Sequence, residues 1–267
     1  ETLKSLKIIN SSFILSIVGK LVSFIYQRCD LILGQSRSFE SEINKYSFNQ
    51  LKFRYFPSWS EDLVEETSYK NLPILSNDND FFKIVFTGNI GKSQDFESIL
   101  LAAEILKGSH IRAKFLIFGD GRMKNDLEDQ ILSKGLKEQI QICGLYPLSA
   151  MPSIYHQSDA LLATLKATPA FEKTIPGKIQ SYMLSSRPIL TMLSGEGSRI
   201  IDDAKCGLTA NSGDFLKLIE NIKILMELNE EDRNKMGLNG RSYSEVEFNR
   251  KSLIDRLEKW FLEIKSI

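Results

Sequence analysis

The feature that most constrains the fold of this chain is a regular alternation of apolar runs and amphipathic stretches from residue 82 onward. Short runs rich in Val, Ile, Leu and Phe predict buried strands, and stretches with a period near 3.6 residues predict helices. The predicted strands are 83–87, 113–118, 140–143, 160–164 and 188–192; the predicted helices are 95–107, 123–134, 150–156, 178–184, 198–205 and others within 214–267. This alternation is typical of a parallel sheet covered by helices, so we expect an open α/β fold.

A shorter pattern of the same kind precedes residue 60. A predicted helix over 13–26 is followed by an apolar run at 30–33 and by a predicted strand at 51–56. Residues 60–80, between the two patterns, are largely polar and have the composition of a linker. We therefore expect a domain boundary there, between residues 66 and 67.

The charge balance and the cysteine content exclude several classes of function. Lys and Arg number 34, as do Asp and Glu, so the formal net charge is zero and a nucleic-acid partner is disfavoured. Cys29, Cys143 and Cys206 are widely spaced and odd in number, which fits neither a disulfide framework nor a zinc site. We expect a cytoplasmic protein without a metal site of its own.

Glycine-containing loops follow the first two strands of the longer pattern. The first loop contains Gly88, Asn89, Gly91, Lys92 and Gln94, and the second contains Gly119 and Gly121. Glycine lets the backbone approach a phosphate closely, and a nearby lysine adds positive charge. Neither loop matches the dinucleotide motif G-x-G-x-x-G or the P-loop motif. Tight turns between strand and helix, without a ligand, remain the alternative.

The segment 168–182, which follows the strand 160–164, holds a further candidate site. Thr174 is predicted to cap a helix whose first turn contains Pro176, Gly177 and Lys178, leaving backbone N–H groups free for an anion. Glu172 lies just ahead of that helix and can contact sugar hydroxyl groups. The alternative is an ordinary capped helix with an exposed lysine and glutamate.

The helix predicted over 13–26 is too short to span a bilayer, which takes about 20 apolar residues, and Lys20 interrupts it. Helices of this kind mostly pack on their own sheet, and we expect this one to do so. Peripheral contact with a membrane surface, helped by Lys20 and Arg28, is the alternative.

The order and spacing of several segments carry a family resemblance. These segments are 28–36, 55–59, 86–91 (Phe-Thr-Gly-Asn-Ile-Gly), 117–121 (Ile-Phe-Gly-Asp-Gly), 142–145, 176–182 (Pro-Gly-Lys-Ile-Gln-Ser-Tyr) and 195–197 (Gly-Glu-Gly). Together they resemble glycosyltransferase family 4, in particular the branch that includes aminosugar transferases of bacterial O-antigen and capsule assembly. The resemblance extends over residues 8–267.

The resemblance implies a GT-B fold, in which two Rossmann-like domains face each other across a cleft. Residues 1–66 would be the C-terminal part of the acceptor-binding domain, whose opening strands this chain is expected to lack. Residues 67–248 would form the nucleotide-sugar-binding domain. Residues 249–267 would form a helix that crosses back to the acceptor domain.

The resemblance also implies roles for individual residues. The loop from Gly88 to Gln94 would wrap the diphosphate, and the loop that begins at Gly144 would frame the base. Glu172 would contact the donor hexose. Glu172 and Lys178 are the residues expected to act in the reaction itself.

The chain departs from the family pattern at three positions. The family commonly has Arg and Lys where this chain has Asn89 and Gln94, so Lys178 and Lys92 are expected to supply the positive charge. The family's second glutamate, which usually holds the ribose, corresponds to Ser181. A serine hydroxyl donates only one short hydrogen bond, whereas a carboxylate accepts from both ribose hydroxyls.

The function that the resemblance implies is retaining transfer of a hexosyl unit, of the N-acetylhexosaminyl type, from a UDP-sugar. The acceptor would be a glycan or a polyprenyl-diphosphate-linked sugar, which places the reaction in the cytoplasm or at the inner face of the membrane. Neither a metal nor a cofactor would be required, because backbone N–H groups and lysine can stabilise the departing UDP.

Two other functions remain open from the sequence. A sugar-nucleotide epimerase shares the two-domain fold but needs acid and base groups from both domains, and this chain contains only two histidines. A non-catalytic binding module with a degenerate donor site is the second alternative. The changes at Asn89, Gln94 and Ser181 favour it, and weak or absent nucleotide binding would identify it.

Overall fold

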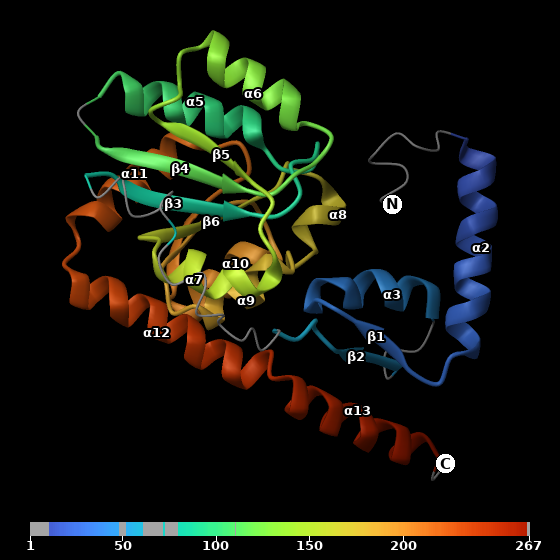
Figure 1. Cartoon of the computed structure of the whole chain (residues 1–267). Helices are drawn as coiled ribbons and strands as arrows, with labels where there is room; N and C mark the ends of the chain where they lie inside the picture. The colour runs from blue at the N-terminus through green and yellow to red at the C-terminus, as the bar shows by residue number, and fades with distance from the viewer. Residues whose placement is uncertain (1–10, 48–51, 61–71, 73–79, 110, 266–267) are drawn as a thin grey trace.

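The computed structural model of the chain describes residues 11–47, 52–60, 72, 80–109 and 111–265 (Figure 1). The linker expected over 60–80 lies almost entirely outside the described residues, and so does the boundary expected between residues 66 and 67.

A six-stranded, entirely parallel sheet forms the centre of the larger part of the molecule (Figure 1). Its strands are β3 (Phe82–Thr87), β4 (Ala113–Phe118), β5 (Ile140–Gly144), β6 (Ala160–Thr164), β7 (Ile189–Met192) and β8 (Gly207–Ala210). In space their order is β5-β4-β3-β6-β7-β8. The expected α/β fold with a parallel sheet is confirmed. Strand β8 was not predicted, because Gly207 and Thr209 interrupt its apolar character.

The strand order places a topological switch point at the centre of this sheet. From β3 the chain builds outward to β5, and it then returns to place β6 on the other side of β3. The connections therefore leave β3 and β6 in opposite directions, which opens a crevice beyond their carboxyl ends. Ligands of open α/β sheets bind in such a crevice.

Both faces of the large sheet are covered by helices, because alternate residues of each strand point to opposite sides. Ile84 and Phe86 of β3 belong to the apolar cluster under α5 (Phe96–Lys107), α6 (Lys124–Ser133) and α11 (Phe215–Glu227). Val85 belongs to the cluster under α7 (Met151–His156), α9 (Lys178–Leu184) and α10 (Glu196–Ala204).

Two long helices end the chain. Helix α12 (Glu230–Glu247) begins at an N-cap in which the Asn229 side chain accepts a hydrogen bond from the Asp232 N–H, and it packs on α9. Helix α13 (Arg250–Lys265) continues past the large sheet to the smaller unit, where the rings of Trp260 and Phe56 meet edge to face at 6.3 Å (Figure 1).

The smaller unit precedes the large sheet in the chain. It consists of α2 (Ser12–Arg28), β1 (Ile32–Gly34), the 3-10 turn η1 (Arg37–Phe39), α3 (Glu40–Ser47) and β2 (Phe53–Tyr55). Strands β1 and β2 pair in parallel, and the buried side chains of Ile32, Ile43 and Phe53 form its core. We refer to residues 11–60 as the N-terminal unit.

The expectation that the first helix is buried on its own sheet is wrong for the described residues. Helix α2 contacts α3, but Phe13 is 73% exposed and Leu21 is 56% exposed. It lies on the side of the N-terminal unit away from the large sheet (Figure 1). Amphipathic periodicity predicted the helix but not what covers its apolar face. Among the described helices, none combines the length and the apolar character that crossing a bilayer requires.

Candidate functional site

A cavity of about 540 Å³ lies at the carboxyl ends of β3 and β4, a size typical of small-molecule sites. The loops after β3, β4 and β5 contribute to it, together with the first turn of α9. It is lined by Thr87, Gly88, Asn89, Phe118, Gly119, Asp120, Leu145, Tyr146, Leu148, Met151, Tyr155, Gly177, Lys178 and Ser181.

The two glycine loops are packed directly against each other through their backbones. The Gly88 N–H donates to the Phe118 carbonyl at 2.9 Å, and the Ile90 N–H donates to the Asp120 carbonyl at 2.7 Å. A Cβ on Gly119 would lie 1.9 Å from the Gly88 carbonyl oxygen, and Gly119 has a φ of +151°. Only glycine allows this approach. The glycine at position 119 is therefore required for the two loops to pack together as a wall of the cavity.

Lys178 is the cation of this cavity. Its Nζ donates to the Gln94 Oε1 at 3.2 Å, lies 3.5 Å from the Phe86 ring centroid, and lies 3.6 Å from where a Cβ on Gly88 would be. It makes no ion pair with any described residue. Burial lowers the pKa of Lys178 to about 7. The ammonium group thus lies beside the glycine loop without a counter-ion from the described chain, as an anion-binding group requires.

Two buried tyrosines hold the end of β3 at the floor of the cavity. The Thr87 N–H donates to the Tyr182 hydroxyl at 2.9 Å, and the Thr87 hydroxyl lies 3.1 Å from that of Tyr155. The two tyrosine rings meet edge to face at 5.4 Å. Burial raises the pKa of both phenols, so both stay neutral at physiological pH. The network therefore fixes the start of the Gly88 loop without adding charge.

The side of the cavity after β5 is apolar. Phe118 and Tyr146 meet edge to face at 5.4 Å, while Leu145 and Leu148 are 72% and 66% exposed. Exposed leucines beside an aromatic ring form a surface on which a planar base can pack. Sequence reasoning named the loop after Gly144 but missed Tyr146, Leu148, Met151 and Tyr155 as lining residues. The position of Tyr146 and Leu148 directly after β5 was an available signal, whereas Met151 and Tyr155 belong to α7.

The structure brings together six of the residues that the sequence singled out, and places the others around them. Those lining the cavity are Gly88, Asn89, Gly119, Gly177, Lys178 and Ser181. Gly91, Lys92 and Gln94 line a smaller neighbouring cavity of about 180 Å³, from which Gln94 reaches Lys178. Gly121 packs against the Ile90 carbonyl, and Gly144 ends β5 with a φ of +81°.

The expectation that Thr174 caps the helix of Lys178 is wrong. A short helix that was not predicted, α8 (Pro169–Glu172), comes first, and Thr168 caps it by accepting from the Phe171 N–H at 3.1 Å. The Thr174 hydroxyl instead donates to the Ala170 carbonyl at 2.8 Å, and α9 begins after Gly177. Pro169 after Thr168 is the signal that was overlooked, since proline is favoured in the first turn of a helix.

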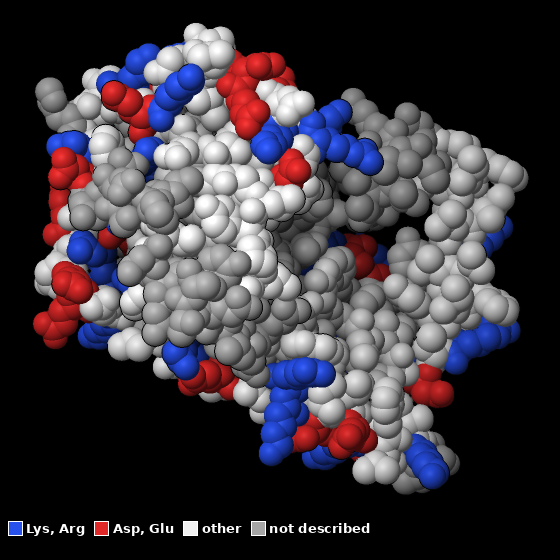
Figure 2. All heavy atoms as spheres, viewed as in Figure 1, with Lys and Arg blue, Asp and Glu red and all other residues white. Residues whose placement is uncertain are grey.

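Glu172 and Pro176 lie outside the lining of the cavity. Glu172 is exposed at the end of α8, and Pro176 packs against Gly197 at the start of α10. The described residues contain no group of three or more His, Cys, Asp or Glu side chains suited to share a metal ion. On the face drawn in Figure 2, acidic and basic side chains are interspersed, in keeping with the balanced composition.

Comparison with known proteins adds a family match. Residues 70–243 match the family model described as glycosyl transferases group 1. The chain is 27% identical to a probable glycosyltransferase, WbjE, of Pseudomonas aeruginosa over 225 residues, which cover 79% of this chain and 53% of the relative. It is 28% identical to a putative colanic acid biosynthesis glycosyl transferase, WcaI, of Escherichia coli K12, over 48% of this chain and 32% of the relative. The matched part of the chain thus spans about half the length of WbjE and about a third of the length of WcaI.

Among solved structures, Anabaena Alr3699/HepE in complex with UDP-glucose superposes with a TM-score of 0.75 at 13% identity. The match covers 92% of this chain and 67% of that one. Sucrose-phosphate synthase from Thermosynechococcus elongatus has a TM-score of 0.77 at 13% identity, over 97% and 64% of the two chains. These likenesses show that the fold is that of GT-B glycosyltransferases.

Proposed function

Because this chain belongs to the family of group 1 glycosyl transferases, we propose that it binds a UDP-sugar and takes part in retaining transfer of the sugar. The observation that carries this proposal is Lys178, a partly buried lysine with no described ion-pair partner, in the cavity beside the Gly88 loop. A diphosphate in this position supplies the missing counter-charge.

The diphosphate is proposed to lie between the Gly88 loop and the first turn of α9. When the bond from the sugar to the diphosphate breaks, negative charge grows on the β-phosphate. A fixed ammonium group and backbone N–H groups stabilise that charge most effectively in a site shielded from water. We assign this role to Lys178, with Gln94 holding its Nζ in place. Charge stabilisation of this kind requires no metal ion.

The positions proposed for the base and the ribose are based on the other residues that line the cavity. We assign the base to the surface formed by Leu145, Tyr146 and Leu148. Ser181, which lines the cavity one helical turn beyond Lys178, is left to bind the ribose. A single hydroxyl there predicts weaker ribose recognition than a carboxylate would give.

The transferred sugar is proposed to be a hexose of the N-acetylhexosaminyl type, contacted by Glu172. The acceptor is proposed to be a glycan or a polyprenyl-diphosphate-linked sugar in the synthesis of a surface polysaccharide such as O-antigen or capsule. Support for the pathway comes from the relative named for colanic acid biosynthesis. An epimerase is disfavoured because His156, the histidine among the described residues, is absent from the lining of the cavity.

If the acceptor is lipid-linked, the proposed reaction takes place at the inner face of the cytoplasmic membrane. Helix α2 supports peripheral contact, because Phe13, Ile17, Leu21 and Phe24 are each more than half exposed. Sedimentation with vesicles that contain anionic phospholipid tests this assignment. A Leu21→Asp variant should bind them less than the wild type. Unchanged sedimentation, or self-association through α2 detected by gel filtration, would argue against it.

Calorimetric titration with UDP and with UDP-N-acetylglucosamine tests the proposed function. We expect saturable binding by the wild type, and at least a tenfold loss in a Lys178→Met variant, since a hydrogen-bonded charge contributes about 1.5–3 kcal/mol. Lys223→Met removes an exposed lysine of α11 that is absent from the lining of the cavity and serves as the matched control. A folded wild-type chain that binds neither ligand would point to the degenerate binding module instead.

A further inference from the structure

The short helix α8 carries the proposed sugar contact, Glu172, at its C-terminal end. Its own turns are fixed by local hydrogen bonds from the Phe171 N–H to Thr168 Oγ1 and from the Thr174 hydroxyl to the Ala170 carbonyl. A four-residue helix has too few internal hydrogen bonds to hold its position alone. The position of Glu172 therefore depends on what α8 packs against.

The start of α10 lies directly against the backbone of Glu172. A Cβ on Gly195 would lie 2.0 Å from the Glu172 carbonyl oxygen, and Gly195 has a φ of +86°. The next residue, Glu196, has a side chain that is only 4% exposed. Burial by itself raises the pKa of Glu196, but hydrogen bonds from Arg199 and Ser38 outweigh it and hold the pKa below its ordinary value. Glu196 is therefore a buried carboxylate that stays ionised.

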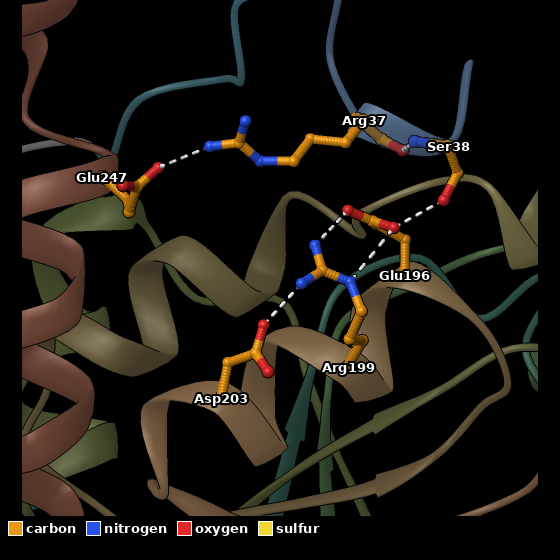
Figure 3. Close-up of polar contacts among 7 residues, drawn as sticks. Arg37, Ser38, Glu196, Arg199, Asp203 and Glu247 are labelled. Atoms are coloured by element: carbon orange, nitrogen blue, oxygen red, sulfur yellow. Dashed lines mark hydrogen bonds and ion pairs between the residues drawn. The ribbon is translucent and has the colours of Figure 1, made fainter. Parts of the chain in front are cut away.

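The N-terminal unit contacts α8 and α10 at two points. The Ser38 hydroxyl of η1 donates to Glu196 Oε2 at 2.5 Å, while Arg199 holds the same carboxylate from the other side (Figure 3). Lys173, the residue after Glu172, forms an ion pair with Glu42 of α3 at 2.6 Å. Both side chains of that pair are about three-quarters shielded from solvent, and Lys173 is the main cause of the lowered pKa of Glu42.

A third contact in the same region is weaker. Arg37 lies 3.8 Å from Glu247 and is 59% exposed, so the ion pair contributes little (Figure 3). The two short contacts are thus the ones that hold the N-terminal unit against α10 and the end of α8. They join residues separated by 131 and 158 positions in the chain.

We propose that Glu42 and Ser38 of the N-terminal unit are positioning residues for Glu172. Glu42 acts through Lys173, and Ser38 acts through Glu196 and the Gly195 contact. The inference rests on the proposed function. It means that the donor-sugar contact is correctly placed only while the N-terminal unit is seated on α8 and α10. A misplacement of about 1 Å is enough to impair a binding or catalytic contact.

Comparison of UDP and UDP-N-acetylglucosamine affinities tests this inference. The Glu42→Gln variant should bind UDP-N-acetylglucosamine about fivefold more weakly, while its affinity for UDP stays unchanged, because Glu172 lies outside the nucleotide cavity. Glu42 also pairs with Lys45 within α3 at 2.8 Å, so Lys173→Gln, which removes only the ion pair to the residue after Glu172, should give a loss of the same size. Glu104→Gln, which breaks an ion pair of 2.5 Å to Lys134 between α5 and α6, is the matched control.

Amide hydrogen exchange provides a readout that needs no ligand. Exchange of the amides of residues 170–174 should become faster in Glu42→Gln and should stay unchanged in Glu104→Gln. Unchanged exchange, or an equal loss of affinity for UDP and UDP-N-acetylglucosamine, would overturn the positioning role. If the wild type binds neither ligand, the proposed function itself fails, and the inference fails with it.

Discussion

The lowered pKa of Lys178 makes the affinity for a nucleotide sugar depend on pH in a defined direction. In the free protein its pKa is about 7, below the ordinary 10.5, because the ammonium group is buried. A bound diphosphate places negative charge beside the ammonium group and raises its pKa again. Binding above pH 7 must therefore take up a proton, whereas binding below pH 7 does not.

The magnitude follows from the fraction of free protein in which Lys178 is charged. With a pKa of about 7, that fraction is about three-quarters at pH 6.5 and about 3% at pH 8.5. If Lys178 stays charged in the complex, the dissociation constant rises about 25-fold across this interval, which corresponds to about 1.9 kcal/mol.

The assay is calorimetric titration with UDP-N-acetylglucosamine between pH 6.5 and 8.5. This ligand is preferable to UDP, since a terminal phosphate takes up its own proton at about pH 6. Lys178→Arg is the control, because a guanidinium group stays charged throughout and should give a flat profile. A flat profile for the wild type, or the same slope in Lys178→Arg, would refute the reasoning.

The same pKa also predicts an effect on folding stability. The folded-state pKa lies below the unfolded value, so the folded state bears the full cost of the buried charge below pH 7. This cost is relieved as the pH rises from 7 toward 10.5. Lys178→Met should accordingly raise the melting temperature at neutral pH while abolishing binding. A lowered melting temperature would contradict the assignment of an uncompensated buried cation.

Three further predictions test the walls of the cavity. Gly119→Ala should destabilise the protein by about 2–4 kcal/mol in urea unfolding, because the new Cβ would overlap the Gly88 carbonyl; a change below about 0.5 kcal/mol would contradict the packing argument. Tyr182→Phe leaves the Thr87 N–H without its acceptor and should cost about 1–3 kcal/mol in the same assay, whereas a neutral result would show that another acceptor takes over. Leu148→Asp should weaken UDP binding severalfold without lowering the melting temperature, since the side chain is 66% exposed; unchanged affinity would remove it from the base-binding surface.

The elements of the large sheet were readable from the sequence because their physical cause is local. The run 115–118 is apolar throughout, as is typical of a strand buried on both faces, and glycines follow the strands where the backbone turns into the loops of the cavity. The short helix α8 and strand β8 were not predicted, because four residues are too few to establish a hydrophobic period. The exposure of α2 was not predicted either, because amphipathicity does not reveal which surface an apolar face meets.

The sequence by itself determined the fold class and the types of residue, glycine above all, that follow the strands. Local periodicity and the conformational freedom of glycine are properties of the chain alone. Only the tertiary structure decided which of these residues share a cavity. It placed Lys178 in the cavity beside the Gly88 loop but Lys92 in a neighbouring cavity, and it brought Glu42 to Lys173 across a separation that local periodicity cannot predict. It also decided the charge of Lys178, because a pKa depends on the surroundings that folding assembles and not on neighbours in sequence.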